Sequence, residues 1–563
     1  ADHAQTVEAI LATSIEVLRG PSTLLYGGGA IGGVVNVIDR RFANSLPDAP
    51  SFALEARHDS AADTNTLVGS ADFNSGALVW HIDGVLRNWN NLEIPGMAID
   101  SRYLPESQTA PGSKGFIPNT AGDGDSALLG VSRIFSNGVI GLAINQQNNH
   151  YGLPTGVAES GDSAEPEEGV YIDMERTRYE VMSEWENLAS WAEKVDYRAS
   201  YTDYAHAEIE SGGDVGTRFS NESWQHRLQI THTDSADRHG VVGLQHSNEK
   251  FSALGDESFI PITNISSSGI FVVEDFHAMA ATIEIGARLN RDDYQPQFQL
   301  SPNAAFTTTS LSGSALWDIS SRITTGLSVS RSQRTPSVEE LYSNFGLTSV
   351  DDCIIHFATG SCEIGSSDFT EETSLNTDLT LYMDYGRFNS TMTVFYNRFN
   401  DYIGQVESGI YIEGFPVREY LQDDAHFHGL ELDVNIELNS QYRLRLFGDV
   451  IRGAYDRNGA APRMPPKRLG LELNYSAEQW SAHTTLTHAW SQNRPGLFEA
   501  STNSWTRLDA GADYRISTST GELLVFMTGR NLGNQEIRLS TSYLRGYAPE
   551  AGRSFETGIR YRY

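Results

Sequence analysis

The sequence predicts an all-β protein: a transmembrane antiparallel β-barrel of about 22 strands, with an N-terminal plug in its lumen. Three observations lead to this fold class. The 563 residues include 51 glycines, 24 tyrosines and 24 phenylalanines, yet only 39% are apolar. Between residues 52 and 563, segments of about ten residues with alternating apolar and polar side chains follow one another. Short polar turns alternate with long connections between these segments, which is typical of outer-membrane barrels.

Composition also excludes several classes of protein. No run of about 18 apolar residues occurs, so the chain is not a helical membrane protein. Lys and Arg total 40 against 73 Asp and Glu, which leaves a formal charge of −33. A surface this acidic repels a phosphate backbone, and we therefore expect no nucleic-acid partner.

The C-terminal segment shows the strand alternation most clearly. Phe555, Ile559 and Tyr561 fall on one face of an extended chain. Glu556 and Arg560 fall on the other. This pattern predicts a last strand with one apolar and one polar face.

The connections predict the orientation of the barrel. We expect short turns at residues 74–76, 137–138, 235–237, 385–387 and 439–441. We expect long connections at residues 89–124, 150–172, 205–222, 249–268, 333–370, 401–424, 453–467, 491–505 and 532–552. In such barrels the short turns are periplasmic and the long loops are external. An even number of strands returns both barrel ends to the periplasmic side.

The first residues do not have the barrel pattern, so we divide the chain into a plug at 1–45 and a barrel at 46–563. Asp2 is an N-cap candidate for a short helix. A strand is expected at 15–18, and a glycine-rich hairpin at 27–33 leads to a second strand at 34–38. A barrel of about 22 strands is wide enough to need such a plug.

The two cysteines, Cys353 and Cys362, lie nine positions apart in a loop-like segment. This spacing fits one short disulfide in an oxidising compartment better than a metal ribbon. We expect both cysteines in an external loop.

Two segments carry a resemblance to a known family. Residues 15–27 (IEVLRGPSTLLYG) and 32–38 (GGVVNVI) resemble the end of the plug domain of TonB-dependent outer-membrane receptors. Residues 531–534 and the terminal Tyr563 resemble the last strands of their barrels. The resemblance implies a monomer in the outer membrane of a Gram-negative bacterium, surrounded by outer-membrane lipid. It also implies an inner-membrane energy-coupling complex of the TonB type as partner. That complex grips a box near the receptor's N-terminus, and we expect this box and the start of the plug to be absent here.

A narrower resemblance is to the zinc-uptake branch of this family. It rests on residues 2–4, 151–154, 172–174, 178–179, 251–254, 340–342, 356–359, 363–365, 465–470 and 552–555. It implies Asp2, His3 and His356 as metal ligands, a set whose imidazole nitrogen and carboxylate oxygen suit Zn²⁺. The segment 158–169 departs from the branch, because it is acidic and contains no histidine. Carboxylates alone suit harder cations or a solvated loop.

Other interpretations of these residues stay open. Asp2 is equally an N-cap, His356 a polar residue of the disulfide loop, and Glu363 a weaker ligand candidate. His426 and His428 are interpreted as polar residues that face the lumen.

The functional hypothesis is a receptor that imports a scarce nutrient, either zinc or another metal ion. The alternative is a siderophore or haem receptor, which would share the whole architecture. A passive porin would need an open lumen, and a barrel-embedded hydrolase would need a recognisable nucleophile and base. No such catalytic motif is present in the sequence, so we expect no enzyme and no resident cofactor, with Zn²⁺ as possible cargo.

Overall fold

A computed structural model describes residues 8–19, 21–29, 31–103, 113–154, 169–210, 212–235, 238–255, 258–278, 280–298, 300–356, 359–412 and 414–563. Strands dominate these residues. Among them, no helix is both long enough and apolar enough to cross a membrane.

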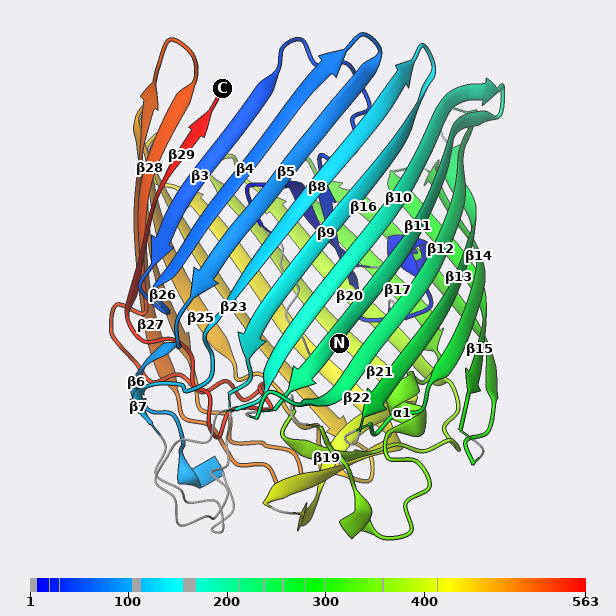
Figure 1. The fold of residues 1–563 in the computed structure, drawn as a ribbon. Helices are drawn as coiled ribbons and strands as arrows, with labels where there is room; N and C mark the ends of the chain where they lie inside the picture. The colour runs from blue at the N-terminus through cyan, green and yellow to red at the C-terminus, as the bar shows by residue number, and fades with distance from the viewer. Residues whose placement is uncertain are drawn as a thin grey trace.

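Twenty-two long strands close into one antiparallel barrel, which confirms the predicted fold class (Figure 1). The ring closes where β29 pairs with β3. The strands are β3 (Ser51–Asp59), β4 (Thr64–Ser75), β5 (Leu78–Trp89), β8 (Gly122–Phe135), β9 (Gly138–Gly152), β10 (Tyr171–Ala189), β11 (Ala192–Ile209), β12 (Val215–Ser235), β13 (Arg238–Gly255), β14 (Thr263–Ala278), β15 (Ala281–Pro296), β16 (Ala304–Ser320), β17 (Ile323–Arg334), β20 (Glu372–Asp384), β21 (Phe388–Ile412), β22 (Phe415–Glu437), β23 (Tyr442–Tyr455), β25 (Arg468–Ser476), β26 (Trp480–Ala489), β27 (Trp505–Ser517), β28 (Glu522–Arg530) and β29 (Ser554–Arg562).

The alternating side chains place an apolar surface outside and a polar surface inside. On β29, Phe555 is 40% and Ile559 is 53% exposed on the outer face. On the inner face, Arg560 forms an ion pair with Glu55 of β3 at 2.6 Å. An exposed apolar exterior around a polar interior is the arrangement of a transmembrane barrel rather than of a soluble sandwich.

Aromatic side chains mark both edges of the apolar belt. On the loop side, a lateral row runs from Ile144 through Tyr179 and Tyr201 to Trp224. Outward positions beyond this row on β9 are polar, namely Gln146, Asn148 and His150. The pairs near the short turns are Phe73–Trp80, Phe135–Trp185, Tyr442–Tyr475 and Trp480–Tyr514. Aromatic girdles of this kind lie at the two membrane interfaces.

The short turns and the C-terminus lie at the end drawn at the top of Figure 1, and the long loops lie at the other end. The loops contain β6 (Glu93–Met97), η2 (Ser101–Tyr103), β7 (Lys114–Phe116), α1 (Val338–Tyr342), η4 (Val350–Asp352), β18 (Ile355–His356), β19 (Ser361–Ile364) and β24 (Gly459–Ala460).

Three predicted long connections are wrong in detail. Residues 205–222, 249–268 and 401–424 belong largely to strand hairpins that continue beyond the membrane. The β21–β22 ladder, for example, extends to the pair Ile412 and Phe415. Backbone hydrogen bonds continue there although the outer face no longer needs apolar side chains, so the alternation is lost while the strand persists.

The segment 8–45 lies within the ring of strands (Figure 1). Its strands β1 (Ala12–Leu18) and β2 (Val34–Asp39) pair antiparallel. The connection between these two strands contains the short helix η1 (Pro21–Tyr26), which lies against the barrel wall. Arg288 of β15 donates to the carbonyl oxygen of Leu24 at 3.0 Å, and Arg19 pairs with Glu431 of β22 at 2.8 Å. The expected helix at the start of the chain lies mostly outside the described residues.

Candidate binding cavity in the barrel lumen

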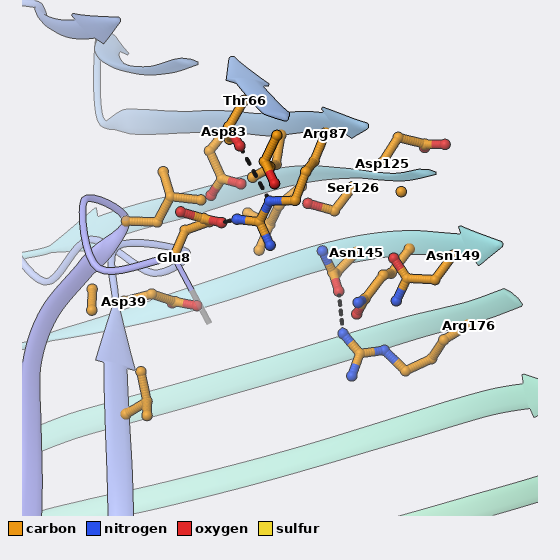
Figure 2. Close-up of a pocket in the computed structure, with 18 of the residues that line it drawn as sticks. Glu8, Asp39, Thr66, Asp83, Arg87, Asp125, Ser126, Asn145, Asn149 and Arg176 are labelled. Atoms are coloured by element: carbon orange, nitrogen blue, oxygen red, sulfur yellow. Dashed lines mark hydrogen bonds and ion pairs between the residues drawn. The ribbon is translucent and has the colours of Figure 1, made fainter. Parts of the chain in front are cut away.

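A cavity of about 660 Å³ separates the segment 8–45 from the wall formed by β3–β5 and β8–β10 (Figure 2). Its lining includes Arg87 and Trp89 of β5, Asn149 and Tyr151 of β9, and Arg176 of β10. All five lie near the loop ends of their strands. The cavity therefore occupies the outer half of the lumen.

The β9–β10 wall of the cavity is rich in hydrogen-bond donors. Alternation on β9 turns Asn145, Gln147 and Asn149 inward, because Ile140, Leu142 and Ile144 occupy the outer face. Arg176 and Arg178 of β10 lie opposite Gln147 and Asn145 in the ladder. Five side chains of these two strands therefore face the cavity with hydrogen-bond donors, namely Asn145, Gln147, Asn149, Arg176 and Arg178.

Arg176 and Arg178 keep hydrogen-bonding capacity in this cavity. An Nη atom of Arg176 donates to the side-chain oxygen of Asn145 at 3.0 Å, as Figure 2 shows. Arg178 pairs with Glu180 at 2.9 Å. The Nε atoms of both arginines are buried and have no hydrogen-bond acceptor among the described residues. Two buried N–H groups therefore lack an acceptor within the described part of the chain.

Positive charge exceeds negative charge at this corner. Arg41, which follows β2, forms ion pairs with both Asp39 and Glu180. Burial raises the pKa of Asp39, but the hydrogen bond from Arg41 outweighs it and holds this pKa below its usual value. Arg41 and Arg178 thus pair with the carboxylates of Asp39 and Glu180, and Arg176 adds a third guanidinium group to the same lining.

On the opposite side of the cavity, charged side chains form ion pairs with one another. Glu8 pairs with Arg57 at 2.7 Å and also with Arg87. Arg87 Nε donates to Thr66 Oγ1 at 3.3 Å. The cavity can consequently offer an anion the hydrogen-bond donors of β9 and β10.

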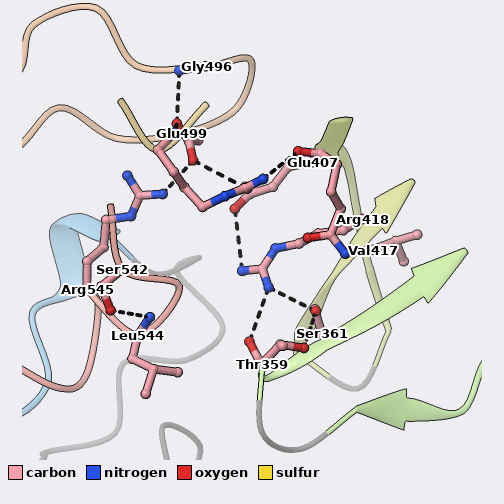
Figure 3. A network of polar contacts seen from close by, with 12 residues as sticks. Thr359, Ser361, Glu407, Val417, Arg418, Gly496, Glu499, Ser542, Leu544 and Arg545 are labelled. Carbon is pink, nitrogen blue, oxygen red and sulfur yellow. Dashed lines mark hydrogen bonds and ion pairs between the residues drawn. The ribbon is translucent and has the colours of Figure 1, made fainter. Parts of the chain in front are cut away.

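A polar network joins the external loops at the outer end of the barrel (Figure 3). The Tyr543 ring lies between two guanidinium groups, with Arg418 at 4.7 Å and Arg463 at 4.4 Å from its centroid. Arg418 donates to the carbonyl oxygen of Thr359 at 3.1 Å. Glu499 accepts a hydrogen bond from Arg545. Five external connections are linked in this way.

The predicted disulfide joins Cys353 and Cys362, with their Cα atoms 6.0 Å apart. It closes the β18–β19 hairpin in the loop between β17 and β20. β19 then adds parallel to β22, where Cys362 lies opposite Val417. The hairpin is therefore fixed to the extended part of the barrel wall.

His356 lies in this hairpin and packs against Phe259 at 4.7 Å between ring centroids. Its Nδ1 lies 3.5 Å from a carboxylate oxygen of Glu363. Burial raises the pKa of Glu363, but His356 and a hydrogen bond from Thr359 outweigh it and lower this pKa. The structure thus brings together His356 and Glu363.

The other two predicted metal ligands belong to the N-terminal end of the chain. Asp2 and His3 lie outside the described residues, as do the acidic side chains Glu159, Asp162, Glu165, Glu167 and Glu168. Within the described ranges, no three His, Cys, Asp or Glu side chains are arranged to hold a metal ion.

The prediction that His426 and His428 face the lumen is wrong. They lie opposite Arg398 and Tyr396 of β21, and Tyr396 is 50% exposed on the outer wall. Ala425, which is 1% exposed, faces inward instead. The even-numbered apolar residues further along β22, such as Leu430, share the face of the two histidines and were a usable signal in the sequence.

Sequence reasoning also missed the donors of the β9–β10 wall. The usable signal was the series Asn145, Gln147 and Asn149, which alternates with the apolar outer residues of the same strand. Arg176 and Arg178 have the same spacing of two.

A closed barrel with a segment and a ligand-sized cavity in its lumen defines the class of outer-membrane receptors and transporters. The family described as "TonB dependent receptor-like, beta-barrel" matches residues 115–532. The chain therefore belongs to this family of TonB-dependent receptors and is located in the outer membrane of a Gram-negative bacterium.

Two relatives are similar in sequence. The "Iron-regulated outer membrane virulence protein" of Vibrio cholerae is 22% identical over 588 residues, which cover 97% of this chain and 78% of that protein. The "Probable TonB-dependent siderophore receptor PirA" of Acinetobacter baumannii is 35% identical over 105 residues. That second match covers 18% of this chain and only 13% of the relative.

Solved structures share the fold across almost the entire chain. The copper transporter OprC superposes with a TM-score of 0.78 at 14% identity, covering 98% of this chain and 86% of its own. The FrpB iron transporter from Neisseria meningitidis gives a TM-score of 0.77 at 13% identity, covering 98% and 88%. The ferric enterobactin receptor PfeA from Pseudomonas aeruginosa gives 0.77 at 13% identity, covering 99% and 87%. These neighbours are receptors and transporters.

Proposed function

We propose that the chain imports a metal nutrient as a negatively charged, oxygen-rich chelate that passes through the lumen cavity. The observation that carries this proposal is the donor-rich β9–β10 wall, where Arg176 and Arg178 each keep a buried Nε without an acceptor among the described residues. Guanidinium groups bind carboxylate-like and catecholate-like oxygens strongly in such partly buried sites.

The size of the cavity supports a small chelate. Ligand pockets commonly measure about 300–1,000 Å³. The lumen cavity of about 660 Å³ lies within this range. Three similar proteins, a siderophore receptor, an iron transporter and a ferric enterobactin receptor, handle cargo of this class.

Zinc remains the second candidate cargo, because His356 and Glu363 lie within 3.5 Å of each other in an external loop. A bare Zn²⁺ ion would need further ligands, and Asp2 and His3 are the proposed ones. A haem receptor would require a flat, largely apolar pocket, for which the polar β9–β10 wall is less suited.

Import also needs energy, because the outer membrane has no ATP pool. We propose that a TonB-type complex supplies it by pulling on residues that precede the lumen segment. The contacts between this segment and the wall are polar, for example Arg19 with Glu431 and Arg41 with Glu180, so water can replace them when the segment moves.

Calorimetry tests the chelate proposal. Purified protein in detergent micelles should bind a ferric tris(catecholate) complex, and the double variant R176Q/R178Q should bind it at least tenfold more weakly. The expectation follows because one hydrogen bond to a charged group contributes about 1.5–3 kcal/mol. Equal affinity of parent and variant would overturn the assignment of the cavity.

The matched control is R198Q, which removes a lumen-facing arginine outside the cavity. Arg198 already pairs with Asp196 at 3.1 Å, so its loss should leave chelate binding unchanged. If the parent protein bound zinc but did not bind the ferric complex, the result would instead favour the zinc hypothesis.

A further inference from the structure

Basic side chains cluster on one side of the barrel's outer wall, directly on the loop side of the apolar belt. We call the following five residues the basic edge: Arg331 of β17, Arg398 of β21, His426 and His428 of β22, and Arg452 of β23. None of them takes part in the lumen cavity.

Strand register brings these residues together. Arg398 lies directly opposite His426, and His428 lies directly opposite Arg452. Adjacent strands are about 4.8 Å apart, so these four side chains cover a patch the size of a lipid head group. Arg331 and Arg398 both lie opposite Leu375 of β20, one on each side.

The basic edge borders the surface that contacts lipid. Leu375 between the two arginines is 51% exposed. Two rows closer to the short turns, Leu379 is 49% and Val394 is 43% exposed on the same face. A lipid whose acyl chains cover these residues would place its head group beside the basic edge.

Carboxylates do not neutralise the arginines of this patch. In the part of the chain that the structure describes, no Asp or Glu lies within ion-pair distance of Arg331, Arg398 or Arg452. Within the basic edge, the ion pair that the described residues form is that of His426 with Asp456 at 3.6 Å. Three arginines without a carboxylate partner between β17 and β23 are unusual in a chain with a formal charge of −33.

The β8–β11 side of the barrel has the opposite charge near the loop ends of its strands. We call this set the acidic edge: Asp123 and Asp125 of β8, Asp173 and Glu175 of β10, and Asp203 of β11, all exposed. Asp123 and Asp173 flank His150 of β9 in one lateral row. Arg218 of β12, a basic residue in this region, lies 3.8 Å from Glu175. Unpaired arginines are therefore not a general feature of the rim.

We infer that the basic edge binds the phosphate-bearing head group of an anionic lipid in the outer leaflet of the membrane. Guanidinium groups bind phosphate with two parallel hydrogen bonds, and basic clusters beside a bilayer attract anionic lipids. The apolar belt below the patch selects a lipid over a soluble anion, because it contacts the acyl chains. The acidic edge repels the same head group, so binding is confined to the β17–β23 side.

Binding of bis-phosphorylated lipid A to the purified full chain in detergent micelles tests this site. The variant R331Q/R398Q/R452Q should bind the lipid at least tenfold more weakly than the parent. The matched control D123N/D173N/D203N neutralises three charges on the acidic edge and should bind at least as tightly as the parent. All substituted side chains are exposed, so each protein should show the same heat-modifiable migration of a folded barrel.

The parent should also bind dephosphorylated lipid A as weakly as the triple arginine variant binds the phosphorylated lipid. Equal affinity of parent and variant, or of the two lipids, would overturn the inference. Inorganic phosphate that binds as tightly as the lipid would identify a simple anion site and would also overturn it. So would a parent dimer that the arginine substitutions dissociate, because the patch would then join two copies of the chain.

Discussion

Glu499 offers the most demanding test of how the external loops are held together. Its side chain is 2% exposed and pairs with Arg545, whose side chain is 10% exposed. One carboxylate oxygen also accepts the backbone N–H groups of Arg463 at 3.1 Å and Gly496 at 3.0 Å. Replacement by alanine removes all these interactions and leaves Arg545 buried without its partner.

The expected cost follows from this geometry. Removing one partner of a buried ion pair costs about 3–5 kcal/mol, and each 1.4 kcal/mol changes an equilibrium about tenfold. Glu499→Ala should therefore increase local opening of the loop network by about a hundredfold to a few thousandfold. Glu499→Gln keeps an acceptor for the two backbone N–H groups, so its effect should be smaller.

Hydrogen exchange measured by mass spectrometry in detergent micelles reports this opening. The amide of Ala548, which donates to the carbonyl oxygen of Leu544 at 2.8 Å, should exchange much faster in the alanine variant. Amides of the central barrel strands should not change. Glu478→Gln, in an exposed short turn at the other end, is the control. Unchanged exchange around Ala548 would refute the structural importance of this network.

Three further predictions concern the loop hairpin and the apolar belt. Replacing both Cys353 and Cys362 by alanine should lower the local stability of the hairpin by about 2–3 kcal/mol; limited proteolysis should detect this, and a lower melting temperature of the entire barrel would contradict it. Because the pKa of Glu363 is lowered in the folded protein, its ionised form stabilises the hairpin above the usual pKa of 4.5, and this contribution is lost as the pH falls through the lower folded value. Hydrogen exchange of the hairpin, corrected for intrinsic rates, should show acid loosening that Glu363→Gln abolishes; loosening of the same size in the variant counts against this cause. Leu379→Arg, in the middle of the apolar belt, should lower the free energy of unfolding of the barrel by about 2–4 kcal/mol, and Tyr385→Arg at the edge of the belt by about 0–1 kcal/mol. Urea unfolding from lipid vesicles measures both values, and equal values would show that the belt is misplaced.

The sequence predicted the barrel well because its signal is local. Alternation such as that of Phe555, Ile559 and Tyr561 depends only on neighbouring residues and on whether lipid covers one face. The signal fails where lipid no longer covers the strand. The hairpin formed by β21 and β22 continues to Ile412 and Phe415 without a regular apolar outer face, and residues 401–424 were predicted as a loop.

The candidate site was less predictable because it is assembled from distant residues. Arg41 reaches Glu180 and Glu8 reaches Arg57 only after the barrel has closed around the lumen segment. Single-residue patterns contained part of the information, since Arg176 and Arg178 share one face. Their unused Nε groups, however, are visible only when every neighbouring acceptor has been placed.

Uptake of labelled metal by cells that produce the full-length protein tests the central claim most directly. The cells are offered iron as a ferric tris(catecholate) complex and, in parallel, free zinc at the same concentration. We predict that iron accumulates from the complex, that dissipating the inner-membrane proton gradient stops this accumulation, and that R176Q/R178Q reduces it at least tenfold. Accumulation of zinc without iron, with or without the two arginines, would contradict import of an anionic chelate through this cavity.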